Sequence, residues 1–324
     1  MTMPRETIVQ AVNDALHTEM AADDRTLVFG EDVARSGGVF RATDGLLEAF
    51  GEERVRDTPL SEIAIVGAAV GLATHGYRPV VEIQFSGFLP PAFDQLVSNA
   101  SRIRWRTRGR LTAPMVVRTP YGAGVRALEH HSESLEAAYA HVPGLKVAIP
   151  STPADAKGLL TSAIRDPDPV LFMEPKRVYR SFREEVPDGE HAVPLGEAAV
   201  RREGADVTVV SWGAMMHPTL EAVDELGVDA EVVDLRSISP LDRETLLASV
   251  RKTGRCVVVH EAAKSGGFGA EVAATVAEDA LLYLEAPIRR VTGFDVPVPL
   301  LSMEDYYPPQ PPRIAAAIEE TAEF

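Results

Sequence analysis

Short runs of β-branched and aliphatic residues alternate with longer amphipathic segments along the N-terminal part of the chain. Such runs, bounded by turn residues, are typical of buried strands, and apolar residues spaced three or four apart are typical of helices. The predicted strands are Thr26–Gly30, Val80–Gln84, Met115–Arg118, Lys146–Ile149 and Val170–Met173. The predicted helices are Thr7–Met20, Ile63–His75, Ala92–Trp105, Ser134–His141 and Pro153–Arg165. This alternation predicts a parallel sheet with crossover helices.

The chain becomes polar and contains prolines around Arg183–Pro194, as is typical of a linker. A second α/β pattern follows, with strands at Val207–Val210, Ala230–Asp234 and Cys256–His260 and helices at Pro218–Leu226 and Arg313–Thr321. A length of 324 residues also exceeds one typical core. The sequence therefore predicts an α/β protein in which residues 1–185 form a layered parallel-sheet domain, 186–200 a linker, and 201–324 a smaller α/β domain.

A single carboxylate, Glu62, stands directly before the most apolar of the predicted helices. The residues from Ile63 to Thr74 carry only aliphatic, glycine and threonine side chains, so we expect that helix to be buried. A glutamate in this place lies at the positive end of the helix dipole. It is either a capping residue or a proton-handling group in a dry site, and the local sequence leaves both interpretations open.

The charge of the chain argues against some classes of partner. The net charge is −16, whereas a nucleic-acid-binding protein needs a basic face. The one basic cluster, residues 102–110, is more typical of an interface or a helix end. No apolar stretch is long enough to cross a membrane, and no signal peptide is recognisable. The one cysteine, Cys256, lies in a strand pattern without a disulfide partner, so we expect a cytoplasmic protein.

Several familiar catalytic and phosphate-binding motifs are missing from the sequence. It contains no G-x-x-x-x-G-K-[ST] loop, no G-x-G-x-x-G after the first strand, no H-E-x-x-H, no paired-cysteine zinc pattern and no G-x-S-x-G elbow. The short run Gly122-Ala123-Gly124 is only a weak phosphate signal.

Polar and aromatic residues near the predicted strand ends are the remaining candidates. Gln84 ends a strand, which is where open parallel sheets bind ligands. Phe88 follows a glycine in a loop and is either a core residue or a platform for a flat ring. His130 and His131 precede a predicted helix and are either solvated or include one acid–base group. Metal binding is disfavoured because no third ligand is spaced nearby.

Taken together, several motifs resemble the β-subunit of thiamine-diphosphate-dependent 2-oxo acid dehydrogenases, the decarboxylating first component of the pyruvate and branched-chain complexes. They are Asp57-Thr58-Pro59-Leu60-Ser61-Glu62, Glu82-Ile83-Gln84-Phe85, His131-Ser132, Pro143-Gly144-Leu145-Lys146-Val147, Ala156-Lys157-Gly158-Leu159-Leu160, His260-Glu261-Ala262 and Gly266-Gly267-Phe268. The matches extend from near Thr7 to the last helix and are specific only in combination.

The resemblance implies a thiamine-diphosphate pyrimidine-binding domain followed by a transketolase-type C-terminal domain, in an α2β2 heterotetramer. The β chain would hold the aminopyrimidine of thiamine diphosphate, and the α-subunit would hold Mg²⁺ and the diphosphate. The family's diphosphate motif begins Gly-Asp-Gly, and that triplet does not occur here. This chain would therefore supply half of an active site. A lipoyl-bearing dihydrolipoyl acyltransferase is implied as a further partner.

The resemblance also implies roles for individual residues. Glu62 would bind the N1′ nitrogen of the cofactor, and Leu60, Gln84 and Phe88 would line the same pocket, with Phe88 replacing the usual tyrosine. His131 would handle protons during acyl transfer to the lipoyl group.

Two further expectations rest on the same resemblance. Backbone oxygens would form a potassium site that involves Met115, Ala163, Ile164, Asp166 and Asp168, although an ordinary acidic turn explains that loop equally well. His260 and Glu261 would serve a subunit interface.

The sequence leaves the substrate open between pyruvate and branched-chain 2-oxo acids. Residues 86–88 favour the pyruvate type and residues 132–137 the branched-chain type, and pockets that differ by a methylene discriminate by only about 1–3 kcal/mol. An acetoin dehydrogenase β-subunit is an alternative. The missing diphosphate motif argues against a self-sufficient transketolase-like enzyme, and the presence of Glu62 and His131 argues against a noncatalytic scaffold subunit.

Overall fold

Seven strands form the first sheet of the computed structural model, which describes residues 4–324. Their order across the sheet is β12-β6-β7-β5-β4-β2-β3, and every neighbouring pair is parallel except β12 with β6. The strands are β2 (Thr26–Gly30), β3 (Val55–Asp57), β4 (Arg78–Glu82), β5 (Val116–Tyr121), β6 (Lys146–Ala148), β7 (Val170–Pro175) and β12 (Ser237–Ser239). The predicted parallel sheet is therefore confirmed.

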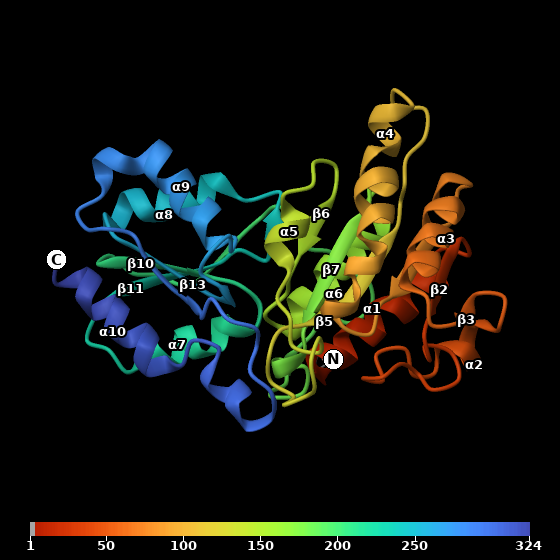
Figure 1. The fold of residues 1–324 in the computed structure, drawn as a ribbon, viewed down its shortest axis with the longest axis horizontal. Coiled ribbons are helices and arrows are strands. Elements are labelled where there is room, and N and C mark those ends of the chain that lie inside the picture. Colours follow the sequence, from red (N-terminus) through yellow and green to blue (C-terminus); the bar gives the residue numbers. More distant parts are fainter. Residues whose placement is uncertain (1–3) are drawn as a thin grey trace.

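Helices cover both faces of this sheet because successive apolar residues of its strands point to opposite sides. Val80 and Val116 pack with the core that includes helices α1 and α6, whereas Val81 and Val117 pack with the core that includes α3. The helices of this part are α1 (Ile8–Ala22), α2 (Leu46–Phe50), α3 (Glu62–Thr74), α4 (Ile103–Arg106), α5 (Glu136–Ala140) and α6 (Pro153–Arg165). Figure 1 shows α3 and α4 on one side of the sheet.

The segment predicted as one helix over Ala92–Trp105 is helical but irregular. A 3-10 turn at Pro90–Ala92 is followed by a π-helix at Gln95–Asn99, a second 3-10 turn at Ala100–Arg102 and then α4. Pro90 and Pro91 stand at the first positions of the segment, where the missing amide hydrogens would have no acceptor within the helix, so they fit a helix start. The exposed Trp105 lies at the far end of this segment, in agreement with a basic cluster at a helix end.

A second sheet of five strands follows in the order β14-β13-β10-β11-β9, parallel except for β9. Its strands are β9 (Ala199–Arg202), β10 (Val207–Ser211), β11 (Ala230–Asp234), β13 (Cys256–Ala263) and β14 (Arg289–Gly293). Helices α7 (Met216–Asp224) and α10 (Pro311–Ala322) pack together, as do α8 (Arg243–Thr253) and α9 (Gly269–Ala280). Figure 1 shows one pair on each side of the sheet. Cys256 is fully buried, as its strand pattern predicts.

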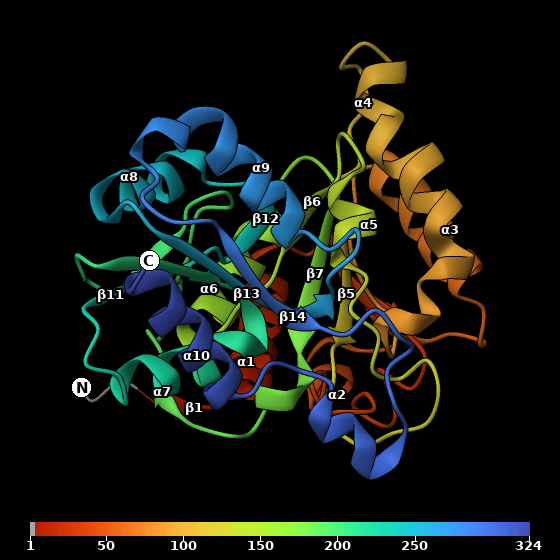
Figure 2. The same ribbon diagram turned by 60° about the vertical axis from the view of Figure 1, so that its left-hand side comes forward.

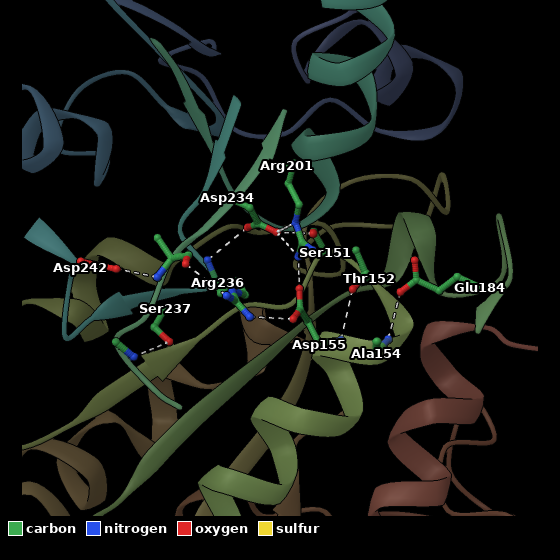
Figure 3. Close-up of polar contacts among 12 residues, drawn as sticks. Ser151, Thr152, Ala154, Asp155, Glu184, Arg201, Asp234, Arg236, Ser237 and Asp242 are labelled. Atoms are coloured by element: carbon green, nitrogen blue, oxygen red, sulfur yellow. Dashed lines mark hydrogen bonds and ion pairs between the residues drawn. The ribbon is translucent and has the colours of Figure 1, made fainter. Parts of the chain in front are cut away.

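Two features connect the two parts of the chain: one strand from the C-terminal half joins the first sheet, and a group of ion pairs lies beside it. Strand β12 comes from the C-terminal half of the chain and extends the first sheet beside β6, as Figure 2 shows. Near this strand, Asp155 at the start of α6 accepts hydrogen bonds from both Arg201 and Arg236, and Asp234 binds Arg201 at 2.8 Å (Figure 3). A short two-stranded ribbon, β1 (Arg5–Glu6) with β8 (Glu184–Glu185), precedes the connection.

Helix α3 is less buried than the sequence predicts. Ile65, Val66 and Ala69 face the core, but the side chain of Ile63 is 48% exposed and the preceding Leu60 is 79% exposed. The expectation of a buried helix is therefore wrong for one face of α3, because neighbouring elements of this chain cover only the other face. An apolar face of this kind is typical of a surface that contacts another protein. Within residues 4–324, no helix is long and apolar enough to cross a membrane.

Candidate active site

Glu62 is the first residue of α3 and lies half-buried at the carboxyl-end edge of the first sheet. The preceding Ser61 is the N-cap residue, and its side chain makes no capping hydrogen bond. In the described part of the chain, no hydrogen bond or ion pair involves the Glu62 carboxylate. The observed contacts therefore do not fit a capping role, and they leave the carboxylate available for a ligand.

Two further carboxylates follow strand β2 and join Glu62 at this edge. Glu31 lies close enough to Glu62 that burial, together with the charges of Glu62 and Asp32, raises the pKa of the Glu31 carboxyl. The Asp32 carboxylate accepts a hydrogen bond from Gln84 Nε2 at 3.4 Å. Parallel strands β2 and β4 are neighbours, which brings residues after both strand ends together. Glu62 and Gln84 thus lie on the same carboxylate-rich edge.

Phe88 and His131 meet in a small aromatic group. The His131 imidazole lies 4.4 Å from the ring of Phe85 and 5.1 Å from the ring of Phe88, centre to centre. Phe88 belongs to a 3-10 turn at Ser86–Phe88, directly after β4, and both Phe88 and His131 are half-buried. His131 Nδ1 lies 2.9 Å from the backbone oxygen of Glu129. The two residues predicted from separate motifs are therefore in contact.

The glycine run 122–124 binds carboxylates of its own chain. The N–H of Ala123 donates to Glu261 Oε2 at 2.8 Å, and the N–H of Gly124 donates to Glu304 Oε1. Gly122 has a φ of +80°, and an added Cβ there would lie 2.4 Å from a Glu261 oxygen, so glycine is required on both counts. The N–H of Gly122 donates to the backbone oxygen of Glu133, and those of Ala123 and Gly124 have carboxylate partners, so all three donors are already used, which agrees with the weak phosphate signal seen in the sequence.

His260 and Glu261 lie inside the chain in this structure. The His260 ring is fully buried and stacks on Trp212 with centres 5.2 Å apart, and burial lowers the pKa of His260 to about 4. Glu261 is buried where the two sheets meet, next to Ala123, and burial raises its pKa. Both residues make contacts within one chain, and these burials do not support the expected place at a subunit interface, which stays a prediction.

A buried ion-pair group lies beneath the candidate site. Arg118 donates to Glu174 from Nε at 2.7 Å and from Nη2 at 2.9 Å, and from Nη1 to Glu82 at 2.8 Å. The Tyr179 hydroxyl donates to Glu174 as well. All of these side chains are almost completely buried, and burial raises the pKa of the Glu82 carboxyl even though the charge of Arg118 lowers it. This group joins strands β4, β5 and β7 below the loop that follows β4.

The five residues expected to hold potassium lie around one turn between α6 and β7: Met115, Ala163, Ile164, Asp166 and Asp168. Protein cations already contact its oxygens. Arg78 donates to the Ile164 carbonyl at 2.8 Å, Lys146 pairs with the Asp166 carboxylate at 2.5 Å, and Arg104 pairs with Asp168 at 2.7 Å. These contacts fit a turn neutralised by arginine and lysine better than a turn that needs a further cation. The potassium site stays a prediction.

Sequence reasoning missed three of the residues around the site. Glu31 and Asp32 directly follow a correctly predicted strand, so the rule that ligands bind at carboxyl ends of parallel strands could have identified them. No local signal identifies Glu304, because its partners lie almost two hundred positions away in the sequence. Leu60, in contrast, lies at the predicted edge but is exposed in the single chain.

Comparisons with known proteins agree with the two-part α/β fold. Residues 6–181 match the family described as the transketolase pyrimidine-binding domain, and residues 196–314 match the transketolase C-terminal domain. The chain is 52% identical over 319 residues to the pyruvate dehydrogenase E1 component subunit beta of Acholeplasma laidlawii, with 98% of each protein covered. It is 50% identical over 325 residues to the corresponding subunit of Bacillus subtilis strain 168, with 99% of this chain and 100% of the relative covered.

Among solved structures, a split-gene transketolase described as an inactive beta4 tetramer superimposes with a TM-score of 0.80. The match covers 99% of both chains at 24% sequence identity. At that identity the likeness shows the fold, and here it extends over both sheets.

Proposed function

The chain belongs to the family of pyruvate dehydrogenase E1 β-subunits, built from transketolase-type pyrimidine-binding and C-terminal domains, and on this basis we propose that it decarboxylates pyruvate together with an α-subunit. It is a subunit of a 2-oxo acid dehydrogenase. The identity of about half the residues over the full chain supports pyruvate over branched-chain substrates. We propose that residues 1–185 form the pyrimidine-binding domain, residues 186–200 a linker and residues 201–324 the C-terminal domain.

One structural observation carries the proposal of a shared active site. Glu62 has a half-buried carboxylate without a partner in residues 4–324, and exposed apolar residues, Leu60 and Ile63, lie next to it. A site that is polar at its centre and apolar at its rim fits a cofactor held between two subunits. We propose that the α-subunit covers this face and that the assembly is an α2β2 heterotetramer.

The residues present fit the aminopyrimidine half of thiamine diphosphate. When bound, this cofactor supplies a carbon nucleophile and an electron sink for decarboxylation. Glu62 would hold a proton at the pyrimidine N1′ atom, and Phe88 would stack on the ring while Leu60 and Gln84 line the pocket. The half-buried Phe88, beside His131, supports this reading because an aromatic face is available at a strand end.

The diphosphate and its Mg²⁺ fit this chain poorly. Within residues 4–324 no group of three or more His, Cys, Asp or Glu side chains could hold a metal ion, and the amides of the glycine run bind Glu261 and Glu304. We therefore propose that the α-subunit holds both. His131 would handle protons when the acyl group passes to the lipoyl group of a dihydrolipoyl acyltransferase. One buried cysteine agrees with a reducing compartment, and we propose the cytoplasm.

The proposal is tested by reconstitution with the α-subunit of the same organism. Oxidation of pyruvate, branched-chain 2-oxo acids and acetoin is measured with an artificial electron acceptor in the presence of thiamine diphosphate and Mg²⁺, with each subunit alone and with both together; for the 2-oxo acids, release of CO₂ is measured as well. We expect activity only in the mixture and the highest kcat/KM for pyruvate. Activity of the single chain would contradict the half-site, and preference for another substrate would contradict the assignment to pyruvate. A mixture inactive on every substrate would favour a noncatalytic scaffold.

A further inference from the structure

Glu304 reaches from the C-terminal half of the chain into the loop that carries His131. It belongs to a 3-10 turn at Leu301–Tyr306, and its side chain is almost completely buried, at 1% exposure. Its Oε1 atom accepts hydrogen bonds from three consecutive backbone amides, those of Gly124, Val125 (3.0 Å) and Arg126 (3.1 Å). Three amides converging on one oxygen form an anion-binding nest, and here the anion is a side chain of the same protein.

The second oxygen of the same carboxylate binds the other end of this loop. Ser132 Oγ donates to Glu304 Oε2 at 2.6 Å, so a single side chain joins the beginning and the end of residues 124–132. Ser132 directly follows His131. On the opposite side, Ser86 Oγ donates to the Glu133 backbone oxygen at 2.6 Å. The histidine is therefore held between a contact from the C-terminal half and a contact from the turn that carries Phe88.

The negative charge of the Glu304 carboxylate strengthens its hydrogen bonds to the loop. Burial opposes ionisation of the carboxyl, but the hydrogen bonds from Ser132, Gly124 and Arg126 outweigh it and lower the pKa of Glu304. Lys176 lies near enough to favour the anion as well. Hydrogen bonds to a charged acceptor are stronger than those to a neutral one. The loop is thus held by ionic contacts to the interior, although many of its own residues are exposed.

We propose that Glu304 is a positioning residue for acyl transfer: by binding residues 124–126 and Ser132 at once, it keeps His131 beside Phe88. The inference rests on the role proposed above for His131. The C-terminal domain contributes no residue to the predicted pyrimidine pocket. Through Glu304 it would nevertheless determine the position of His131. Loss of the Glu304 carboxylate should therefore have two successive effects. Removing the carboxylate should free the loop, and freeing the loop should displace the histidine.

The experiment compares three variants in the reconstituted heterotetramer. Glu304→Ala removes the acceptor, Glu304→Gln keeps an oxygen for the amides but loses the charge, and Ser132→Ala removes only the contact at the end of the loop. Asp305→Asn is the matched control, because it removes the exposed ion pair with Arg126 (2.6 Å) and leaves the Glu304 contacts in place.

Hydrogen exchange of the loop reports positioning directly. We expect amides in a peptide covering residues 124–126 to exchange faster in Glu304→Ala, less so in Glu304→Gln, and at the wild-type rate in Asp305→Asn. Lipoyl acylation should fall on the order of 10–100-fold in Glu304→Ala, as expected for a displaced catalytic group. Decarboxylation with an artificial electron acceptor should fall much less, and Glu304→Gln should restore part of the acylation rate.

A double variant separates this inference from the proposed function. Adding His131→Ala to Glu304→Ala should lower acylation no further than His131→Ala alone. If Glu304→Ala speeds exchange but leaves acylation intact, while His131→Ala lowers it, the positioning role is overturned and the function stands. If His131→Ala has no effect on acylation, the proposed function of His131 fails whatever the exchange shows. If Glu304→Ala does not assemble, Ser132→Ala and Glu304→Gln give the same comparison, and unchanged exchange in both contradicts the inference.

Discussion

The imidazole of His131 packs edge-to-face against the ring of Phe88, with centres 5.1 Å apart and planes at 79°. The two residues come from different loops, one after β4 and one after β5. These strands are neighbours in the parallel sheet, so the loops that leave their carboxyl ends meet. Phe88, predicted to stack on the cofactor, and His131, predicted to be an acid–base group, were inferred from separate motifs and are in contact in the structure.

Replacement of His131 by alanine should separate the two halves of the reaction. We expect lipoyl acylation to fall by about 10²–10⁴-fold, the range for loss of an acid–base group, and decarboxylation with an artificial electron acceptor to fall much less. His130→Ala is a matched control, since the His130 side chain is 61% exposed and lies next in the chain. Equal loss of both activities in His131→Ala would contradict the assigned role.

Replacement of Glu62 by alanine should abolish activation of the cofactor. Without a carboxylate at the pyrimidine, we expect decarboxylation to fall by at least about 10²-fold in the reconstituted heterotetramer. Glu48→Ala, an exposed glutamate on α2, serves as the control. Near wild-type decarboxylation by Glu62→Ala, with both subunits assembled, would show that Glu62 does not have this role.

The buried Arg118 should be far more important for stability than an exposed arginine in an ion pair. Arg118→Leu leaves the carboxylates of Glu82 and Glu174 buried without their cation, which costs about 3–5 kcal/mol. We therefore expect a large fall in the melting temperature. Arg25→Ala breaks the exposed pair with Asp23 and should change it little. Similar shifts for both variants, measured by thermal unfolding of the assembled protein, would refute the distinction.

Glu136 makes stability depend on pH near neutrality. It is fully buried where α5 begins, and burial, followed by the charge of Glu261, raises its pKa from 4.5 to about 7. Trp212 lies near enough to lower the pKa slightly, although neither carboxylate oxygen has a hydrogen-bond partner in the described residues. The folded state thus holds this proton more tightly than the unfolded state, and stability falls as the pH rises from 4.5 through 7.

Glu136→Gln should remove that dependence. At pH 8 we expect the variant to be more stable than the wild type by roughly 1–3 kcal/mol, since each unit of pKa difference corresponds to about 1.4 kcal/mol. Well below pH 4.5 the advantage should vanish, because the wild-type side chain is then protonated in both states. Unfolding in urea at several pH values measures the difference, and a constant offset across the range would argue against titration of Glu136.

The sequence by itself determined most regular elements of this protein. Strands Thr26–Gly30 and Ala230–Asp234 and helix Pro153–Arg165 form with the predicted bounds. The reason is local: apolar runs and periodicity report burial, and α6 begins at an N-cap threonine, Thr152, followed by proline. Glu62, Gln84, Phe88 and the pair His130-His131 were singled out because each stands out against apolar or loop sequence, whereas the roles predicted for them rest on the family resemblance.

Only the tertiary structure decided which segments meet. Strand β12 joins the first sheet although it follows the second sheet's β11, because its pairing with β6 depends on how the two parts of the chain pack. The exposed face of α3 and the contact between Glu304 and the His131 loop have the same origin. A pattern of apolar and polar residues states that a position is buried or charged, but the partner that buries or neutralises it is selected by contacts between residues far apart in the chain.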